Sequence, residues 1–289
     1  MRRAYLPRAL YVLVSLILIA SAVVWVVAGN LTSPAPQSIG DLPKDLNGWP
    51  VQFQSSSGTT IHGWLIPGVK GAGAIALMHG VRSNRLSMLA RARFLSQAGY
   101  TVLLFDFQAH GESQGKHITF GKLESKDAEV AIQFLRQNAP GEKIGVVGES
   151  MGGAAAILAS PPLNADAMIL EMVYPTIEEA VSNRIATRFG NWSRILTRLL
   201  VLQLRPRLGI NPEELRPIDS VGGITCPKLF IAGAKDRYTP LEESQRLYDT
   251  AAAPKEFWVV EGAGHQDLHN AAKTEYENRV LSFFQQRLR

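Results

Sequence analysis

The sequence predicts an α/β fold in which a sheet of about eight mostly parallel strands carries helices on both faces, preceded by an N-terminal transmembrane helix. Three observations predict it. Short continuous apolar runs recur through most of the 289 residues, as is typical of strands that are buried on both faces. Amphipathic segments alternate with these runs, which favours a parallel sheet covered by helices. An apolar stretch from Leu10 to Val27 is long enough to cross a bilayer as a helix.

The apolar N-terminus predicts a membrane anchor in residues 1–29. No side chain is charged from residue 9 to residue 40. Three cations and no acid precede the apolar stretch: Arg2, Arg3 and Arg8. By the positive-inside rule, the N-terminus then lies in the cytoplasm and the rest of the chain on the far, extracytoplasmic side. The alternative is a signal peptide that is cleaved after the small residues ending at Ala28, which would release a secreted protein.

Residues 30–49 are rich in Pro, Gly, Ser and Asn and are expected to form a linker. Residues 50–289 then form one domain, which begins with two alternating segments separated by Ser57-Gly58, a pattern typical of an antiparallel hairpin. The later strands are continuous apolar runs. In order, strands are expected at Val51–Gln54, Thr60–Ile66, Ala74–Met78, Tyr100–Phe105, Lys143–Val147, Ala167–Leu170, Leu229–Ala232 and Glu256–Val260.

Segments with helical spacing of apolar residues follow or separate the strands. These segments predict helices at Leu86–Ala98, Leu123–Gln137, Gly152–Leu158, Leu241–Ala252 and Lys273–Arg287. The interval from Pro175 to Pro227 is too long for a simple connection. It is expected to be an insertion, with its helical part at about residues 175–220.

Charge and cysteine content narrow the function classes. The net charge is +5, but three of these charges precede the apolar stretch, and the remaining +2 (5 − 3) gives no reason to expect nucleic-acid binding. Cys226 is the single cysteine, so an internal disulfide and a cysteine-based zinc site are both excluded. No metal or organic cofactor is expected.

The segment Gly148-Glu149-Ser150-Met151-Gly152 lies between a predicted strand and a predicted helix. In this G-x-S-x-G arrangement a sharp turn exposes the serine, and a side chain at either glycine would clash with the packed strand and helix. A serine hydroxyl needs a base to become a nucleophile. In parallel sheets, such partners lie beyond the carboxyl ends of later strands. Asp236 and His265 follow the last two predicted strands.

These motifs resemble those of the α/β-hydrolase superfamily over roughly residues 50–289. The motifs are G-E-S-M-G-G, A-G-A-K-D-R-Y-T-P, G-A-G-H, H-G-V at His79 and D-F-Q-A-H-G-E-S at Asp106. The chain is most similar to the membrane-anchored serine hydrolases and the serine-aminopeptidase-like group. It departs from them at Gln108-Ala109, where many relatives carry Arg-Gly, which leaves its subfamily open.

The chemistry of a serine, an aspartate and a histidine assigns a role in catalysis to each of the three residues. His265 is expected to take the proton of Ser150 and later protonate the leaving group, while Asp236 orients the imidazole. The backbone N–H groups of Val81 and Met151 are expected to form the oxyanion hole.

Several alternatives remain open at this point. Glu171 follows a predicted strand and can replace Asp236 as the acid, and His269 can replace His265 as the base. The run from His265 to His269 can also be interpreted as part of a metal site. His79 and His110 are expected to pack turns, and Asp106 is expected to bind loop backbone.

The insertion is expected to form a cap over the site, as the resemblance implies. Its apolar residues follow helical spacing: Trp192, Ile195, Leu196, Leu199 and Leu200. Arginines lie among them and no acid occurs between Ser182 and Ile210: Arg194, Arg198, Arg205 and Arg207. Either these arginines are simply solvated, or the cap meets an anionic membrane surface and admits lipid-like acyl substrates.

The sequence as a whole favours a membrane-anchored serine hydrolase that cleaves carboxylic esters, lipid-like esters or thioesters included, through an acyl-Ser150 intermediate. A carboxylesterase or lipase-like activity is expected, with a small-molecule acyl ester as its substrate. Two alternatives are a peptidase or amidase that acts on short peptides, and a non-catalytic anchored module that only binds.

Overall fold

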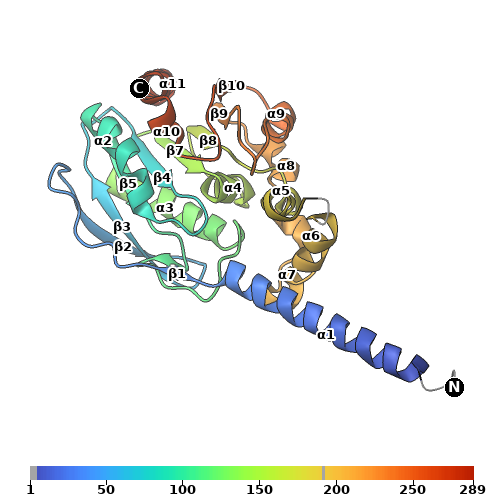
Figure 1. The fold of residues 1–289 in the computed structure, drawn as a ribbon. Helices are drawn as coiled ribbons and strands as arrows, with labels where there is room; N and C mark the ends of the chain where they lie inside the picture. The colour runs from blue at the N-terminus through green and yellow to red at the C-terminus, as the bar shows by residue number, and fades with distance from the viewer. Residues whose placement is uncertain (1–4, 191–192) are drawn as a thin grey trace.

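The computed structural model describes residues 5–190 and 193–289, and its centre is an eight-stranded sheet in the order β10-β9-β8-β7-β4-β5-β3-β2 (Figure 1). Strand β3 runs antiparallel to both of its neighbours, and the other pairs are parallel. The predicted mostly parallel sheet is therefore confirmed. The strands are β2 (Trp49–Gln54), β3 (Thr60–Ile66), β4 (Ala74–Met78), β5 (Thr101–Phe105), β7 (Ile144–Glu149), β8 (Ala167–Glu171), β9 (Lys228–Gly233) and β10 (Lys255–Val260).

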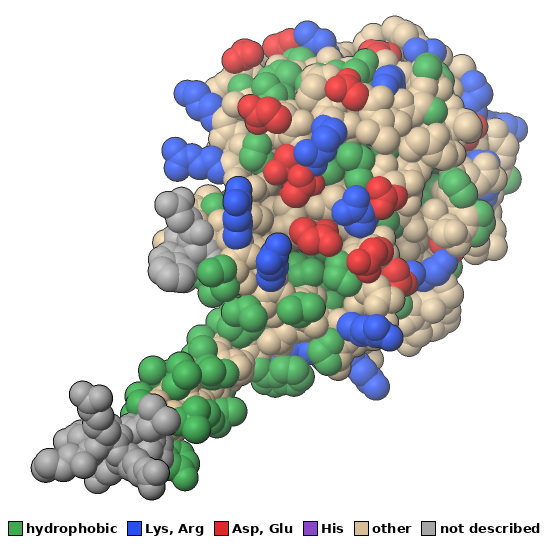
Figure 2. Space-filling model, turned by 90° about the vertical axis from the view of Figure 1, so that its right-hand side faces the viewer, with side chains coloured by type: hydrophobic (Ala, Val, Ile, Leu, Met, Phe, Trp, Pro, Cys, Tyr) green, Lys and Arg blue, Asp and Glu red, His purple; other side chains and the backbone are tan. Residues whose placement is uncertain are grey.

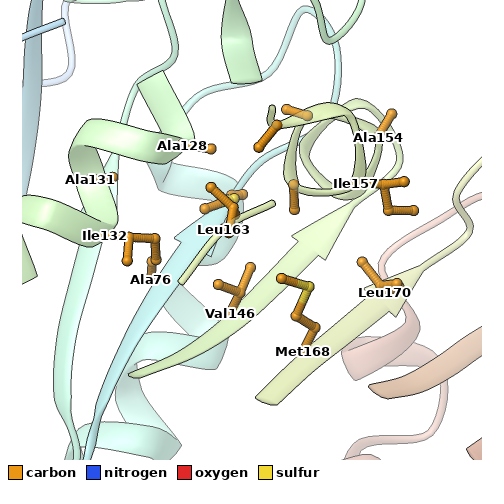
Figure 3. Packing of buried hydrophobic residues seen from close by; sticks show 14 of the residues in the cluster. Ala76, Ala128, Ala131, Ile132, Val146, Ala154, Ile157, Leu163, Met168 and Leu170 are labelled. Atoms are coloured by element: carbon orange, nitrogen blue, oxygen red, sulfur yellow. The ribbon is translucent and has the colours of Figure 1, made fainter. Parts of the chain in front are cut away.

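Helices cover both faces of this sheet, and each face has its own apolar core. Helices α2 (Leu89–Gln97) and α11 (Lys273–Leu288) pack on one face, and α3 (Glu124–Asn138), α4 (Met151–Leu158) and α9 (Leu241–Thr250) pack on the other. Figure 3 shows the second core, where Ala76, Val146 and Met168 of neighbouring strands face side chains of α3 and α4. Burial of each side chain of about valine or leucine size contributes roughly 1.5–3 kcal/mol.

The N-terminal helix α1 (Tyr5–Thr32) extends away from this domain (Figure 1). Residues 9–32 are long and apolar enough to cross a membrane, with a mean hydropathy of 2.7. Apolar side chains surround the exposed part of the helix, and Lys and Arg side chains lie on the domain around the point where it joins (Figure 2). Arg2 and Arg3, on which the predicted orientation depends, lie outside the described residues.

The predicted linker, residues 30–49, is fastened to the domain. Strand β1 (Ala35–Pro36) pairs in parallel with β6 (His110–Gly111). The amide of Asn84 donates to Gln37 Oε1 at 2.8 Å. Two-residue strands show no sequence periodicity, so composition alone could not reveal this attachment.

The predicted insertion forms a helical cap with a small core of its own, made by Ile177, Val201, Leu204, Ile210 and Leu215. Trp192 lies outside the described residues. The cap elements are α5 (Ile177–Phe189), α6 (Ser193–Val201), α7 (Leu204–Leu208), η3 (Pro212–Leu215), α8 (Pro217–Ser220) and η4 (Val221–Gly223).

The helix expected from Leu86 to Ala98 begins differently from the prediction. Its first turn is a separate 3₁₀ helix, η1 (Arg85–Met88), which precedes α2. The Asn84 side chain accepts the N–H of Leu86 at 3.0 Å and starts the turn. Asparagine caps compete in this way for backbone donors near helix starts.

A buried carboxyl on α3 predicts an unusual pH dependence of stability. Asp127 accepts hydrogen bonds from Ser55 Oγ at 2.6 Å and from Gln108 N at 2.8 Å, and burial raises its pKa to about 7. Between about pH 4 and pH 7 the folded state therefore holds a proton that the unfolded state has lost, so stability falls as pH rises. Asp127→Asn, a neutral isostere, is expected to stabilise the protein relative to wild type by up to about 4 kcal/mol at pH 7 and little at pH 4.

Urea unfolding of the full chain in detergent at several pH values measures this difference. The exposed Asp41 provides the control through Asp41→Asn, whose curve is expected to run parallel to that of the wild type. A constant difference between Asp127→Asn and wild type across pH 4–7 would contradict a protonated Asp127.

Candidate active site

Ser150 occupies a strained turn between β7 and α4. Its φ is +50°, a conformation that costs energy for a residue with a side chain and is typical of functional sites. A Cβ at Gly152 would lie 2.3 Å from Met78 O, and one at Gly148 would lie 2.6 Å from Gly153 Cα. Both positions therefore require glycine. Ser150 is 2% exposed, and its Oγ has no hydrogen-bond partner among the residues that the structure describes.

Asp236 and His265 lie in the loops that follow β9 and β10, and their side chains are joined. His265 Nδ1 lies 2.7 Å from Asp236 Oδ2. The other oxygen of Asp236 accepts the N–H groups of Tyr238 at 2.8 Å and Thr239 at 2.9 Å. The Tyr238 ring stands edge-on to the imidazole, with centroids 5.4 Å apart. The carboxylate is thus fixed by backbone donors and holds one nitrogen of the imidazole.

Val81 and Met151 are the residues whose backbone N–H groups are expected to form an oxyanion hole. Met151 is the first residue of α4, so its N–H has no acceptor within the helix. Val81 follows β4, and both residues line the same cavity. The next residue, Arg82, has a φ of +55°, so the loop after Val81 is also strained.

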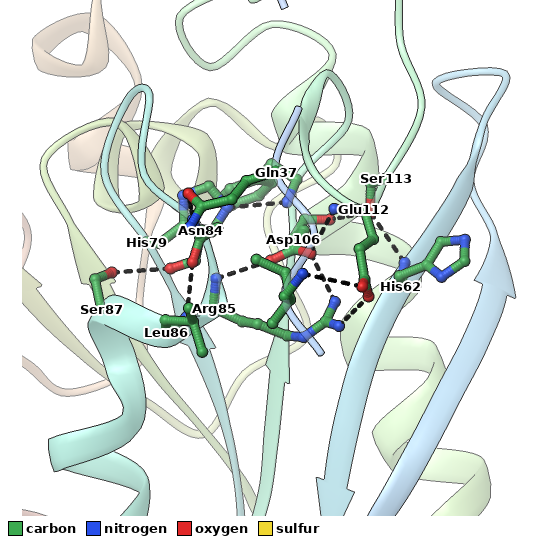
Figure 4. Close-up of polar contacts among 12 residues, drawn as sticks. Gln37, His62, His79, Asn84, Arg85, Leu86, Ser87, Asp106, Glu112 and Ser113 are labelled. Atoms are coloured by element: carbon green, nitrogen blue, oxygen red, sulfur yellow. Dashed lines mark hydrogen bonds and ion pairs between the residues drawn. The ribbon is translucent and has the colours of Figure 1, made fainter. Parts of the chain in front are cut away.

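Asp106 braces the loop that carries Val81 (Figure 4). Its carboxylate accepts the N–H of Arg85 at 2.8 Å and the N–H of Glu112 at 3.0 Å. The Arg85 guanidinium lies 2.6 Å from the same carboxylate and also pairs with Glu112. Asp106 therefore binds loop backbone, as its position in the sequence predicted.

His79 and His110 also hold turns. Phe107 N donates to His79 Nε2 at 3.1 Å, so His79 Nδ1 carries the proton and donates to Gly80 O at 2.8 Å. Burial lowers the pKa of His79 to about 3, which keeps the ring neutral. His110 Nε2 accepts the N–H of Arg82 at 3.0 Å. Both rings thereby fix the backbone on either side of Val81.

Glu171 and His269, the alternative acid and base, have other partners. Glu171 Oε2 lies 2.6 Å from Arg91 Nη2, and its Oε1 accepts the hydroxyl of Tyr276. His269 Nε2 lies 2.8 Å from Glu277 Oε1, and its ring stacks on Phe94. Because Glu171 and His269 are each engaged by other side chains, these contacts favour Asp236 as the candidate acid and His265 as the candidate base.

A cluster of acidic side chains around Arg91, here called the Arg91 cluster, links the segments next to Ser150 and His265. The sequence did not predict it. The fully buried Arg91 lies 3.0 Å from Asp267 and 3.7 Å from Glu149, in addition to its contact with Glu171. Asp267 is two residues past His265, and Glu149 precedes Ser150. A single arginine on a helix gives no sequence signal of such a role, because most arginines are exposed.

An apolar cavity of about 550 Å³ opens beside the site. Val81, Met151 and Tyr238 form its inner end. The cap contributes helices α5 and α6, and α1 contributes a third wall. The charged side chains among the described lining residues are Arg184 and Arg188. A concave, mostly apolar pocket with few polar groups is typical of a small-molecule site.

Comparisons with known proteins agree with this architecture. A family model described as serine aminopeptidase S33 (Hydrolase_4) matches residues 70–217. Protein YqkD of Bacillus subtilis is 28% identical over 79% of this chain and 76% of its own length. Protein Rv2307c of Mycobacterium tuberculosis is 28% identical over 90% of this chain and 89% of its own length. Both relatives are described as uncharacterized.

Solved structures share the fold. The esterase Pf2001 of Pyrococcus furiosus superimposes with a TM-score of 0.74 at 23% identity, covering 89% of this chain and 99% of that one. The esterase EaEST of Exiguobacterium antarcticum gives a TM-score of 0.61 at 17% identity, covering 81% of this chain and 98% of that one.

Proposed function

The chain belongs to the serine aminopeptidase S33 family of α/β hydrolases, and we propose that it is a membrane-anchored serine hydrolase that cleaves carboxylic esters. Ser150 is its nucleophile, His265 its base and Asp236 its acid. The observation that carries this proposal is the 2.7 Å contact between His265 and Asp236, which lie after strands of the same parallel sheet whose strand β7 leads into Ser150, held at a positive φ.

The reaction proceeds in two halves. His265 Nε2 takes the hydroxyl proton as Ser150 Oγ attacks the ester carbonyl, and Asp236 stabilises the imidazolium that forms. The N–H groups of Val81 and Met151 bind the developing oxyanion, and loss of one such donor typically costs about 10²–10³-fold in rate. Collapse breaks the bond to the alcohol, which leaves with the proton of His265. Water, deprotonated by the same imidazole, then attacks the acyl-serine and releases the carboxylic acid.

The lining of the cavity favours esters over peptides. An aminopeptidase must hold the cationic amino terminus of its substrate, for which a carboxylate is the usual partner. The charged residues described in this lining are the arginines Arg184 and Arg188. These repel an ammonium group and tolerate an acyl chain with a neutral or anionic head.

Helix α1 supports the anchored location within this proposal. Its uncharged span follows Arg2, Arg3 and Arg8, and the positive-inside rule therefore predicts an extracytoplasmic domain. Protease digestion of intact cells or spheroplasts tests this orientation, since only an extracytoplasmic domain is accessible.

Labelling with a fluorophosphonate probe tests the activity itself. The probe reacts with an activated serine, so wild type is expected to be labelled, while Ser150→Ala and His265→Ala are not. Ser244→Ala is the matched control, because Ser244 is also buried and its Oγ has no hydrogen-bond partner among the described residues. Its labelling is expected to equal that of wild type.

A panel of esters, thioesters and aminoacyl amides then defines the substrate class. Faster turnover of amides than of esters would favour a peptidase. A folded wild-type protein that is not labelled would refute the hydrolase proposal in favour of a binding module.

A further inference from the structure

The anchor helix forms a wall of the substrate cavity, and from this we infer that the substrate is a lipid-like acyl ester taken directly from the bilayer. The inference rests on the proposed ester hydrolysis and names its substrate class and route. The acyl chain would lie between α1 and the cap, with its ester at Ser150.

The cavity connects the catalytic loops with the membrane helix. Val81 and Met151, whose N–H groups are proposed to form the oxyanion hole, belong to its lining. Its outer wall consists of one face of α1: Val23, Val24, Val27 and Leu31. Leu196 and Leu200 of α6 face this wall. The volume of about 550 Å³ lies in the range of ligand pockets. Its walls are mostly apolar, with Arg184 and Arg188 of α5 as the charged residues among the described lining residues.

The depth of this wall in a bilayer follows from helix geometry. A hydrocarbon core of roughly 30 Å takes about 20 helical residues at about 1.5 Å each. If Arg8 marks the cytoplasmic edge, the core ends near Ala28. Val23, Val24 and Val27 then lie within the far leaflet. The cavity wall that they form is therefore at the depth of the lipid chains, where a dissolved acyl chain can enter without crossing water.

The cap surface beside α1 also carries exposed apolar side chains, which suit a position at the depth of the lipid chains. Ile195, Leu199 and Leu202 are 55%, 42% and 71% exposed, although each is a large apolar side chain. Ile195 and Leu199 lie on helix α6, where Arg194 and Arg198 are also exposed, and Leu202 follows the end of this helix. An amphipathic helix of this kind lies at a membrane interface, with arginines at the head groups and apolar side chains in the lipid.

Specific contacts hold α1 in this position. Arg207 of α7 lies over the Trp25 ring at 3.7 Å from its centroid and donates to Trp25 O. Arg82, next to Val81, donates to Asn30 O at 3.0 Å and to Ser33 O at 3.2 Å. The end of the anchor is therefore bound both to the cap and to the loop of the proposed oxyanion hole.

Substitutions on two faces of α1 test the inference in the full-length protein. Val27→Trp places a bulky ring in the cavity, whereas Val26→Trp adds the same ring at a neighbouring position, 59% exposed, that does not line it. The measured quantity is the ratio of kcat/KM for 1-palmitoylglycerol in phosphatidylcholine liposomes to kcat/KM for soluble 4-nitrophenyl acetate. Val27→Trp is expected to lower this ratio at least about tenfold, and Val26→Trp to leave it unchanged. Equal ratios for the two variants would overturn the inference.

A direct contact measurement does not depend on turnover. An alkyl fluorophosphonate with a diazirine at the end of a sixteen-carbon chain is attached to Ser150, and irradiation is expected to cross-link the chain to residues 23–31. Cross-links confined to the cap or absent from α1 would overturn the inference while leaving the labelled serine hydrolase intact. Absence of phosphonate labelling would instead refute the proposed function.

Discussion

Replacement of Asp236 by asparagine is expected to lower kcat by roughly 10⁴-fold while the protein stays folded. The Oδ1 atom of Asp236 accepts the N–H groups of Tyr238 and Thr239, and an asparagine oxygen can accept both. The side-chain amide would then face His265 Nδ1, now 2.7 Å from Oδ2. Because an amide N–H cannot accept from Nδ1–H, the ring would present its proton at Nε2 and could not take one from Ser150.

Steady-state kinetics of Asp236→Asn on a short-chain ester measure this effect, with a thermal melt as the test of folding. KM is expected to change little, because the carboxylate does not contact the substrate. A loss of less than tenfold in kcat would mean that another acid orients the base.

Glu171→Gln distinguishes the two candidate acids. Glu171 is buried against Arg91 and Tyr276, so its loss is expected to reduce stability, while the folded fraction keeps a kcat close to that of wild type. A variant that stays fully folded and loses activity as Asp236→Asn does would reassign the acid to Glu171.

The main strands and helices of the fold were predictable because their patterns of apolar residues are strong. Buried parallel strands such as Ala74–Met78 are apolar on both faces and stand out from the polar turns around them. Strands β1 and β6 have two residues each, too few for any pattern. The start of α2 was misplaced because Asn84, the last residue of the preceding loop, caps a 3₁₀ turn first.

The candidate site was predictable to the extent that it follows strand ends. Ser150 comes directly after β7, and Asp236 and His265 lie in the loops that follow β9 and β10; parallel strands end at one edge of a sheet. The Arg91 cluster was not predictable, since it joins four elements that are remote in sequence. The face of α1 that contacts the domain was also not predictable, because a helix that is apolar on all sides does not indicate which side packs against protein.

Replacement of Arg91 by methionine is expected to lower the free energy of unfolding by about 3–5 kcal/mol. Arg91 is fully buried and contacts Glu171 at 2.6 Å and Asp267 at 3.0 Å. Its Nε also donates to Tyr276 OH at 3.0 Å. Methionine fills similar space without charge, so Glu171, itself fully buried, would keep only the Tyr276 hydroxyl. An unpaired buried carboxylate is far costlier than the absence of both partners.

Urea unfolding with a double-mutant cycle measures this cost. Arg93→Met is the matched control, since Arg93 lies on the same helix but is paired with Asp45 at the surface, where an ion pair contributes little. The double variant Arg91→Met/Glu171→Met is expected to regain much of the lost stability, because it removes both charges together. If the double variant were as unstable as the sum of its single changes, the two groups would be independent. Arg91 would then not be the residue that holds Glu171, the loop of His265 and the strand before Ser150 in one arrangement.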